Sequence, residues 1–392
     1  MSDKANITPN VIKWARESAR ITIEIAAKKV SKSPEELKDW EEGRSQPTIR
    51  QAQALAKVYK RPFALFFLPE IPRDFQPLQD FRKKNSKELG TASIFIIREI
   101  QQKQAWISEV NEENNENKIP FVGKFSINDD IVTVAKDILK TLDINPTNYK
   151  TDNPIKEWID KAESKGIFIS RTSFIHSRLK LDSEEIQGFA IADEYAPFVF
   201  INSDDWNAPQ LFTLVHELAH IWIDESGISN EIEPDLKNKD KFNPVELFCN
   251  EVAANALIPS EVIRNLRHET YNSAKEVYNE SKKLGVSSFA FLFRAFNLDL
   301  ISLEVYNKLK HDADVEFRTF LKNEEEKKAK QKDKGTKGGP NPYLLRLNKN
   351  SRLFTQIVLD AFRGGYVEPT QASALLNTPV NKFSSFDALL YR

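Results

Sequence analysis

Two histidines and a glutamate lie close together in the segment 212–220, which reads FTLVHELAH. Residues four apart on a helix share a face, so His216 and His220 can bind one metal ion together. Glu217 directly follows the first histidine and can take a proton from a water that the ion activates. The pattern predicts a metal-dependent hydrolytic centre. The alternative is that two structural histidines fall at this spacing by chance.

The helix that must carry these residues is expected from about Pro209 to Asp224. At about 100° per residue, its apolar side chains fall on one stripe, while His216 and His220 project from the opposite side. The histidines are therefore not expected on the face that packs against the core. The chain has only five histidines, which makes their pairing on one helix informative.

A third protein ligand is needed to leave one coordination position open for water. A second helix is expected over 244–257, with Asn243 as its cap and a proline at its first position. Glu246 and Asn250 lie four apart on this helix, so Glu246 could complete the site and Asn250 could orient a ligand by a hydrogen bond. Cys249 projects about 60° away from Glu246 and is interpreted as buried packing.

The N-terminal residues contain the positions of a helix-turn-helix. The small residue at the helix crossing is Ala27, the turn residue is Ser31, and the apolar residues of the second helix are Leu37 and Trp40. The run WEEGRSQPT that begins at Trp40 resembles the WExGxxxPT signature of Xre/Cro-type regulators. This resemblance extends over about residues 8–65 and implies a domain of short helices.

Whether this domain binds DNA stays open in the sequence. The exposed positions of its second helix are mostly carboxylates, which repel phosphates: Glu35, Glu36, Asp39 and Glu42. The positive charges that could contact a DNA backbone are Lys28, Lys29, Lys38 and Arg44. The domain is either a DNA-binding module or a folding and partner-docking module that reads no bases.

Three segments between the two regions are β-like, with β-branched and aromatic residues: 166–170, 186–193 and 198–202. The last two flank a plausible hairpin turn. The segment 198–202 is a candidate edge strand that could receive a substrate by strand addition, with Phe198, Phe200 and Asn202 as substrate-binding residues. The alternative is an ordinary strand within the sheet.

The segments FTLVHELAHIWI and VELFCNEVAANALIP together resemble the ImmA/IrrE family of metallopeptidases, over roughly residues 120–310. The resemblance implies that His216, His220 and Glu246 bind Zn²⁺, or Mn²⁺, and that Glu217 is the catalytic base. With the Xre-like N-terminus it implies a fused regulator and peptidase. Members of the family cleave Xre-type repressors, often under stress or in mobile-element control, and fused members occur in toxin–antitoxin-like gene pairs.

Composition bounds the partners and the compartment. Lys and Arg total 56 and Asp and Glu total 57, so any surface for nucleic acid must be local. The single cysteine excludes intramolecular disulfides and cysteine-based zinc clusters. No apolar run approaches the roughly 20 residues of a membrane span, and the N-terminus lacks an apolar signal region. A cytoplasmic protein without membrane attachment is therefore expected.

These observations predict an α+β, mainly helical chain in four parts. The parts are a five-helix helix-turn-helix domain (1–75), a zincin-like peptidase domain with connecting helices and a small antiparallel sheet (76–321), a charged linker (322–340) and a small helical C-terminal module (341–392). The predicted function is a zinc-dependent endopeptidase that cleaves a regulatory protein, either an Xre-type repressor or an antitoxin, and docks to DNA or a partner. The alternatives are a DNA-binding regulator or antitoxin with little or no proteolysis, and an interaction protein that holds a toxin. The sequence gives neither the oligomeric state nor the role of the C-terminal module.

Overall fold

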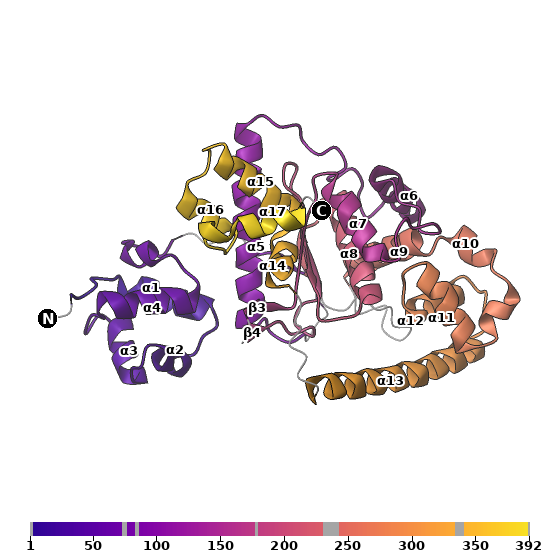
Figure 1. Cartoon of the computed structure of the whole chain (residues 1–392), viewed down its shortest axis with the longest axis horizontal. Helices are drawn as coiled ribbons and strands as arrows, with labels where there is room; N and C mark the ends of the chain where they lie inside the picture. Colours follow the sequence, from indigo (N-terminus) through magenta and orange to yellow (C-terminus); the bar gives the residue numbers. More distant parts are fainter. Residues whose placement is uncertain are drawn as a thin grey trace. The chain divides into compact units, whose positions relative to one another are not determined.

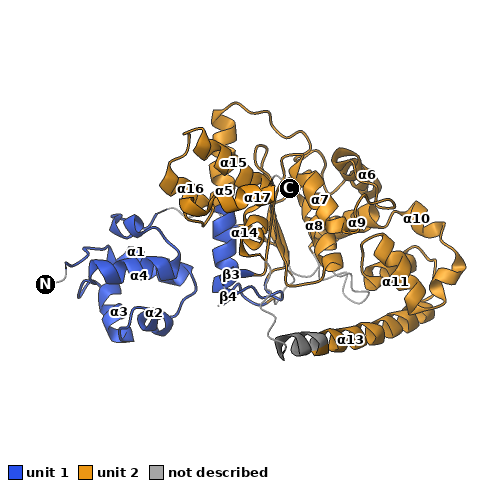
Figure 2. Cartoon of the chain, in the orientation of Figure 1, with its two compact units in different colours: residues 1–77, 87–101, 174–185 blue, residues 78–86, 102–173, 186–392 orange. Residues whose placement is uncertain are grey.

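The structure is a computed structural model, which describes residues 3–72, 77–82, 86–176, 179–229, 243–333 and 341–390. The chain divides into two compact units, coloured separately in Figure 2. Unit 1 comprises residues 1–77, 87–101 and 174–185, and unit 2 comprises residues 78–86, 102–173 and 186–392. The C-terminal residues expected to form a separate module thus group with the peptidase-like part of the chain.

Unit 1 begins with the expected series of short helices. They are α1 (Pro9–Ser18), α2 (Ile23–Lys29), α3 (Pro34–Glu41), α4 (Ile49–Tyr59) and the 3₁₀ helix η1 (Phe63–Phe67). Ser33 starts α3 with a capping box, in which its side chain and that of Glu36 each accept from the other's backbone amide. Ser31, between α2 and α3, takes the left-handed φ of 55° that this turn requires. Because Leu37 and Trp40 are buried, α3 faces the core as predicted.

Further segments complete unit 1. Strands β3 (Phe174–His176) and β4 (Leu179–Lys180) pair antiparallel. The long helix α5 (Thr91–Glu113) contributes residues 91–101 to unit 1 and its remaining residues to unit 2. Within unit 1 the Glu185 carboxylate accepts from the Gly90 amide and the Ser93 hydroxyl, both at 2.7 Å. The start of α5 is therefore fixed by a buried acceptor.

Unit 2 is built around a five-stranded sheet in the order β1-β7-β5-β6-β2. The strands are β1 (Gln79–Asp80), β2 (Phe168–Thr172), β5 (Gly188–Ile191), β6 (Phe198–Asn202) and β7 (Gly227–Ser229). The expected β5–β6 hairpin is antiparallel, but β2 pairs with β6 and β1 with β7 in parallel. The sheet is mixed, so the prediction of an antiparallel sheet was wrong. Longer connections separate these partners and permit parallel pairing, whereas a short turn does not.

Some helices of unit 2 pack on this sheet, and others lie beyond them (Figure 1). They are α6 (Ile131–Leu142), α7 (Pro154–Glu163), α8 (Asn207–Trp222), α9 (Pro244–Leu257), α10 (Ser260–Arg264), η3 (His268–Tyr271), α11 (Ala274–Lys283), α12 (Ser288–Asn297) and α13 (Leu303–Asp333). Helix α8 packs on β5 and β6, and α9 packs on α8. Helix α13 continues through residues 322–333, which the sequence analysis assigned to the linker, and residues 334–340 lie outside the described part of the chain.

The C-terminal helices are α14 (Pro342–Asn350), α15 (Arg352–Arg363), α16 (Pro369–Leu375), η4 (Val380–Lys382) and α17 (Ser384–Leu390). Both α14 and α15 pack on β2. The Ser170 hydroxyl of β2 donates to the Lys349 carbonyl of α14 at 2.6 Å, and the Phe354 ring of α15 lies against Phe168. The edge strand β2 is therefore covered by this module. Among the described helices, none is long and apolar enough to cross a membrane.

Candidate metal centre

Helices α8 and α9 bring three potential metal ligands together. His216 and His220 lie one turn apart on α8, and Glu246 lies in the first turn of α9. Helix α9 begins where the sequence predicts, because the Asn243 side chain accepts from the Val245 amide at 2.9 Å. The three side chains are the only group of this kind among the described residues, and their ligand atoms lie within 4.8 Å of one another.

The distances between these donor atoms suit a small tetrahedral ion. The two histidine Nε2 atoms lie 3.1 Å apart, and the Glu246 oxygens lie 3.3 Å from His216 Nε2 and 3.1 Å from His220 Nε2. A tetrahedral ion with bonds of about 2.0–2.1 Å sets its ligand atoms about 3.3 Å apart. Two imidazoles and one carboxylate are also the donor set of catalytic zinc sites. The residues present therefore fit a metal ion with one position left open.

Asn250 contacts one of the potential ligands. Its Oδ1 lies 2.9 Å from His216 Nδ1, so the amide oxygen accepts from Nδ1–H and leaves Nε2 free to bind a metal. Ser229, at the end of β7, donates from its hydroxyl to Glu246 Oε1 at 3.3 Å. Each of these hydrogen bonds orients one of the potential metal ligands.

Glu217 lies between α8 and the sheet. It is fully buried, and neither of its carboxylate oxygens has a hydrogen-bond partner within the described residues. A Cβ at Gly188 of β5 would lie 2.6 Å from Glu217 Oε1, so glycine at this position makes room for the carboxylate. This buried carboxylate has no hydrogen-bond partner among the described residues and lies next to three potential metal ligands. It is therefore placed to exchange a proton with a reacting group.

The environment of the site shifts the pKa values of its two carboxylates in opposite directions. Burial opposes the ionisation of Glu246, but the facing imidazoles of His216 and His220 outweigh it and hold the pKa of Glu246 at about 2. Burial raises the pKa of Glu217 well above its usual range, and the negative charge of Glu246 adds to this effect. Burial lowers the pKa of His220, which favours the neutral imidazole that a metal requires. The site thus favours the charged form of Glu246, and it raises the proton affinity of Glu217.

Cys249 and Arg294 take structural positions. Cys249 is fully buried in the core and lies outside the ligand cluster, and burial raises the pKa of its thiol. Arg294 donates to the Asn255 side chain at 2.5 Å and to the Ile258 carbonyl at 3.4 Å, so it joins α12 to the end of α9.

The proposed substrate strand is not at an edge. Strand β6 lies between β5 and β2, and its backbone is paired on both sides. Phe198 and Phe200 are fully buried, and the Asn202 side chain donates to the Ile186 carbonyl at 3.1 Å. The prediction that β6 receives a substrate strand was therefore wrong, because β2 occupies the side that had been expected to be open.

Sequence reasoning missed three residues that shape the site: Phe81, Gly188 and Ser229. The Phe81 ring stacks on the His220 ring, with centroids 5.4 Å apart and planes 11° apart. A glycine within the β-like run IQGFAIA could have indicated the close approach at position 188. No local pattern marks Phe81 or Ser229, since their contacts come from distant parts of the chain.

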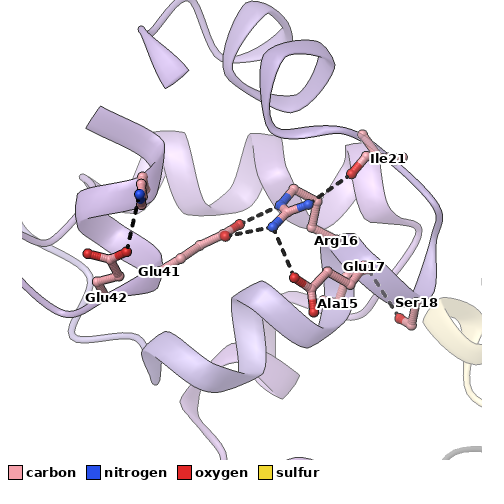
Figure 3. Close-up of polar contacts among 8 residues, drawn as sticks. Ala15, Arg16, Glu17, Ser18, Ile21, Glu41 and Glu42 are labelled. Carbon is pink, nitrogen blue, oxygen red and sulfur yellow. Dashed lines mark hydrogen bonds and ion pairs between the residues drawn. The ribbon is translucent and has the colours of Figure 1, made fainter. Parts of the chain in front are cut away.

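The helix-turn-helix of unit 1 is held by a buried ion pair, drawn in Figure 3. Arg16 of α1 donates from Nε and from a terminal nitrogen to the two oxygens of Glu41, at 2.7 and 2.8 Å, and to the Ile21 carbonyl at 3.1 Å. The hydrogen bonds to Glu41 raise the pKa of Arg16, against the effect of burial. Arg16 therefore locks α1 onto the end of α3 and is not available to phosphate.

The four candidate DNA contacts fall into two groups. Lys38 pairs with Glu42 at 3.8 Å, and Arg44 pairs with Asp39 at 2.6 Å and also with Glu42. Lys28 and Lys29 are exposed at the end of α2 and form no ion pair with the described residues. Asp39 and Glu42 thus neutralise two of the four cations.

Comparison with known families supports the same division. Residues 162–296 match the family model described as IrrE N-terminal-like domain, a peptidase family, and residues 12–66 match the model described as helix-turn-helix. The first match contains all of His216, Glu217, His220 and Glu246, and the second contains α2 to α4. No curated protein matches the chain. The chain therefore carries an Xre-type helix-turn-helix domain followed by a domain of the ImmA/IrrE metallopeptidase family.

Proposed function

We propose that the chain is a zinc-dependent endopeptidase that cleaves a regulatory protein, either an Xre-type repressor or an antitoxin, in the cytoplasm. The observation that carries this proposal is the convergence of His216, His220 and Glu246 beside the unpartnered carboxylate of Glu217. When bound, the metal would act as a Lewis acid on water and on the scissile carbonyl.

The protein supplies the remaining chemistry. The Glu217 carboxylate takes a proton from the attacking water and returns it to the nitrogen of the leaving amine. Asn250 keeps His216 in the tautomer that binds metal, since its oxygen accepts from Nδ1. Burial of all four residues excludes bulk water, which strengthens the electrostatic interactions among them.

The substitution Glu217→Gln separates catalysis from metal binding. The full chain and this variant should hold equal amounts of zinc by elemental analysis, because the three ligands are unchanged. New protein N-termini, mapped in a lysate of the source cells, should appear with the wild-type chain and not with the variant. Wild-type protein purified without chelator that contains no zinc or manganese would refute the proposal.

We also propose that the helix-turn-helix domain docks on DNA through Lys28 and Lys29, which carry its unpaired charge at α2. The helix-turn-helix domain also supports the alternative function, a DNA-binding regulator or antitoxin with little proteolysis. The same purified protein can be used to test DNA binding. A gel shift on the promoter of its own gene should weaken steeply as salt increases. Reversing both charges should abolish the shift, whereas Lys38→Glu should change it little because Lys38 is already paired with Glu42. A biological effect that survives Glu217→Gln would favour the alternative over proteolysis.

A further inference from the structure

Strand β7 lies between β5 and the two-residue edge strand β1, next to the metal centre. One of its sides pairs antiparallel with β5. It follows α8 after a short turn, and its last residue, Ser229, contacts the ligand Glu246. Without β1, the other side of β7 would be an open sheet edge next to the metal ligands, which is a geometry that accepts an extended peptide.

The chain fills this edge with a segment of its own. Gln79 and Asp80 pair parallel with Gly227 and Ile228, and the Phe81 amide donates to the Ile228 carbonyl at 3.2 Å. A ladder of two residues contributes little by itself, because short strands are stable only when side chains anchor them. The segment Leu78–Arg82 therefore depends on its side chains to stay in place.

Phe81 is that anchor. Its side chain is only 5% exposed, and it packs on the His220 ring at the parallel angle described above. A Cβ at residue 227 would lie 2.1 Å from a ring carbon of Phe81, so Gly227 provides the slot in which the ring lies. The slot and the metal ligand together select a flat aromatic side chain.

The other side chains of the segment differ in exposure: Leu78 is half-buried, and the Arg82 side chain is only 7% exposed. Gln79 and Asp80 are exposed, and Arg82 bonds back to the Asp80 carboxylate at 2.7 and 2.8 Å. The Arg82 side chain therefore adds to the burial that the Phe81 ring provides, while the backbone ladder with β7 is only two residues long. Such an occupant can be exchanged for another extended segment that offers an aromatic side chain.

We propose that the β7 edge receives an extended peptide with an aromatic residue in the Phe81 slot, and that Leu78–Arg82 occupies it in cis and covers His220 until displaced. That the incoming peptide is the substrate rests on the proposed peptidase function. The occupancy itself does not rest on that function. The segment acts as an intramolecular competitor beside the metal centre.

The test compares three full-length proteins, the wild type and the variants Phe81→Ala and Phe121→Ala. Phe121 is a matched control, since it is 6% exposed and stacks on Trp222 of the same helix α8, with centroids 4.3 Å apart. In metal-free protein, Phe81→Ala should speed hydrogen exchange of the amides in residues 227–229 by about tenfold or more, because the buried ring is lost. In zinc-loaded protein it should speed release of zinc to EDTA by a similar factor. Phe121→Ala should do neither.

Synthetic peptides test the slot directly. The peptide PLQDFR, which copies residues 77–82, should restore protection of residues 227–229 in metal-free Phe81→Ala protein, and PLQDAR should not. Equal effects of the two peptides, or of the two variants, would overturn the proposal. If the wild type binds no zinc, the proposed peptidase function fails, while the exchange and peptide results still decide whether the segment occupies the edge.

Discussion

Glu163 lies where α7 meets the start of α15, and its protonation is expected to control how firmly the C-terminal helices hold. It accepts from the Ser351 hydroxyl at 2.6 Å and from the amides of Arg352 and Leu353 at 3.0 and 3.4 Å. Burial raises its pKa to about 7, although these donors and the charge of Arg352 work in the opposite direction. The perturbation is Glu163→Gln, which keeps an oxygen acceptor of the same shape and removes the titration.

The sign follows from the direction of the shift. The pKa of Glu163 rises from 4.5 in the unfolded chain to about 7 in the folded one, so between these values the native state binds more protons. Stability therefore falls as pH rises through this window and stays low above it. At about 1.36 kcal/mol for each pH unit, the loss between about pH 5 and about pH 8 is about 3 kcal/mol.

Hydrogen exchange of the α15 amides, corrected for the intrinsic effect of pH, measures this local stability. Because other groups titrate in the same range, the informative quantity is the difference between the wild type and Glu163→Gln. Between about pH 5 and about pH 8 the wild type should lose about 3 kcal/mol more than the variant. If the wild type instead gains stability relative to the variant, the amides at the start of α15 outweigh burial and the reasoning is refuted.

Three further substitutions test the two domains. Asn250→Ala removes the oxygen that accepts from His216 and should weaken zinc affinity by about 10–100-fold in a chelator competition. Asn250→Asp should retain the affinity. Equal affinities of the wild type and Asn250→Ala would contradict this prediction. Gly188→Ala places a Cβ 2.6 Å from Glu217 Oε1 and should lower the rate of cleavage by about tenfold or more with zinc content unchanged, which labelled N-termini and elemental analysis would measure. Ser31→Gly relieves a positive φ and should stabilise the helix-turn-helix by about 1 kcal/mol, visible as slower exchange of α2 and α3, and no gain would show that the turn is unstrained.

Local signals account for what the sequence could predict. Helix α9 begins and ends where expected because its cap, its leading proline and its terminal proline act within a few residues. The helix-turn-helix follows from residues at fixed short spacings, and Ser31 takes the predicted turn conformation even without glycine. The ligand spacing on α8 is likewise a property of a single helix.

Long-range contacts account for what it could not predict. Residues 79–80 lie far from residues 227–228 in the sequence, and a strand of two residues has no periodicity to detect. The side of α8 that carries the histidines was expected to lie away from the core, yet residues 210–222 are all buried, because the sheet and α9 together enclose it. A stripe of apolar residues identifies one face of a helix that packs against the core. It does not indicate whether the opposite face is also buried.

The cover that α14 and α15 place over β2 also bears on how the protein avoids self-association. An uncovered edge strand is a template on which copies of a chain can pair into aggregates. Strand β2 contains Phe168, Ile169 and Thr172, and without residues 341–390 this apolar edge would face water during synthesis and folding. A shortened chain that ends before α14 should therefore precipitate or form oligomers even though it keeps every residue of the metal centre. The C-terminal helices then serve solubility, and engineered versions of the peptidase domain should retain them.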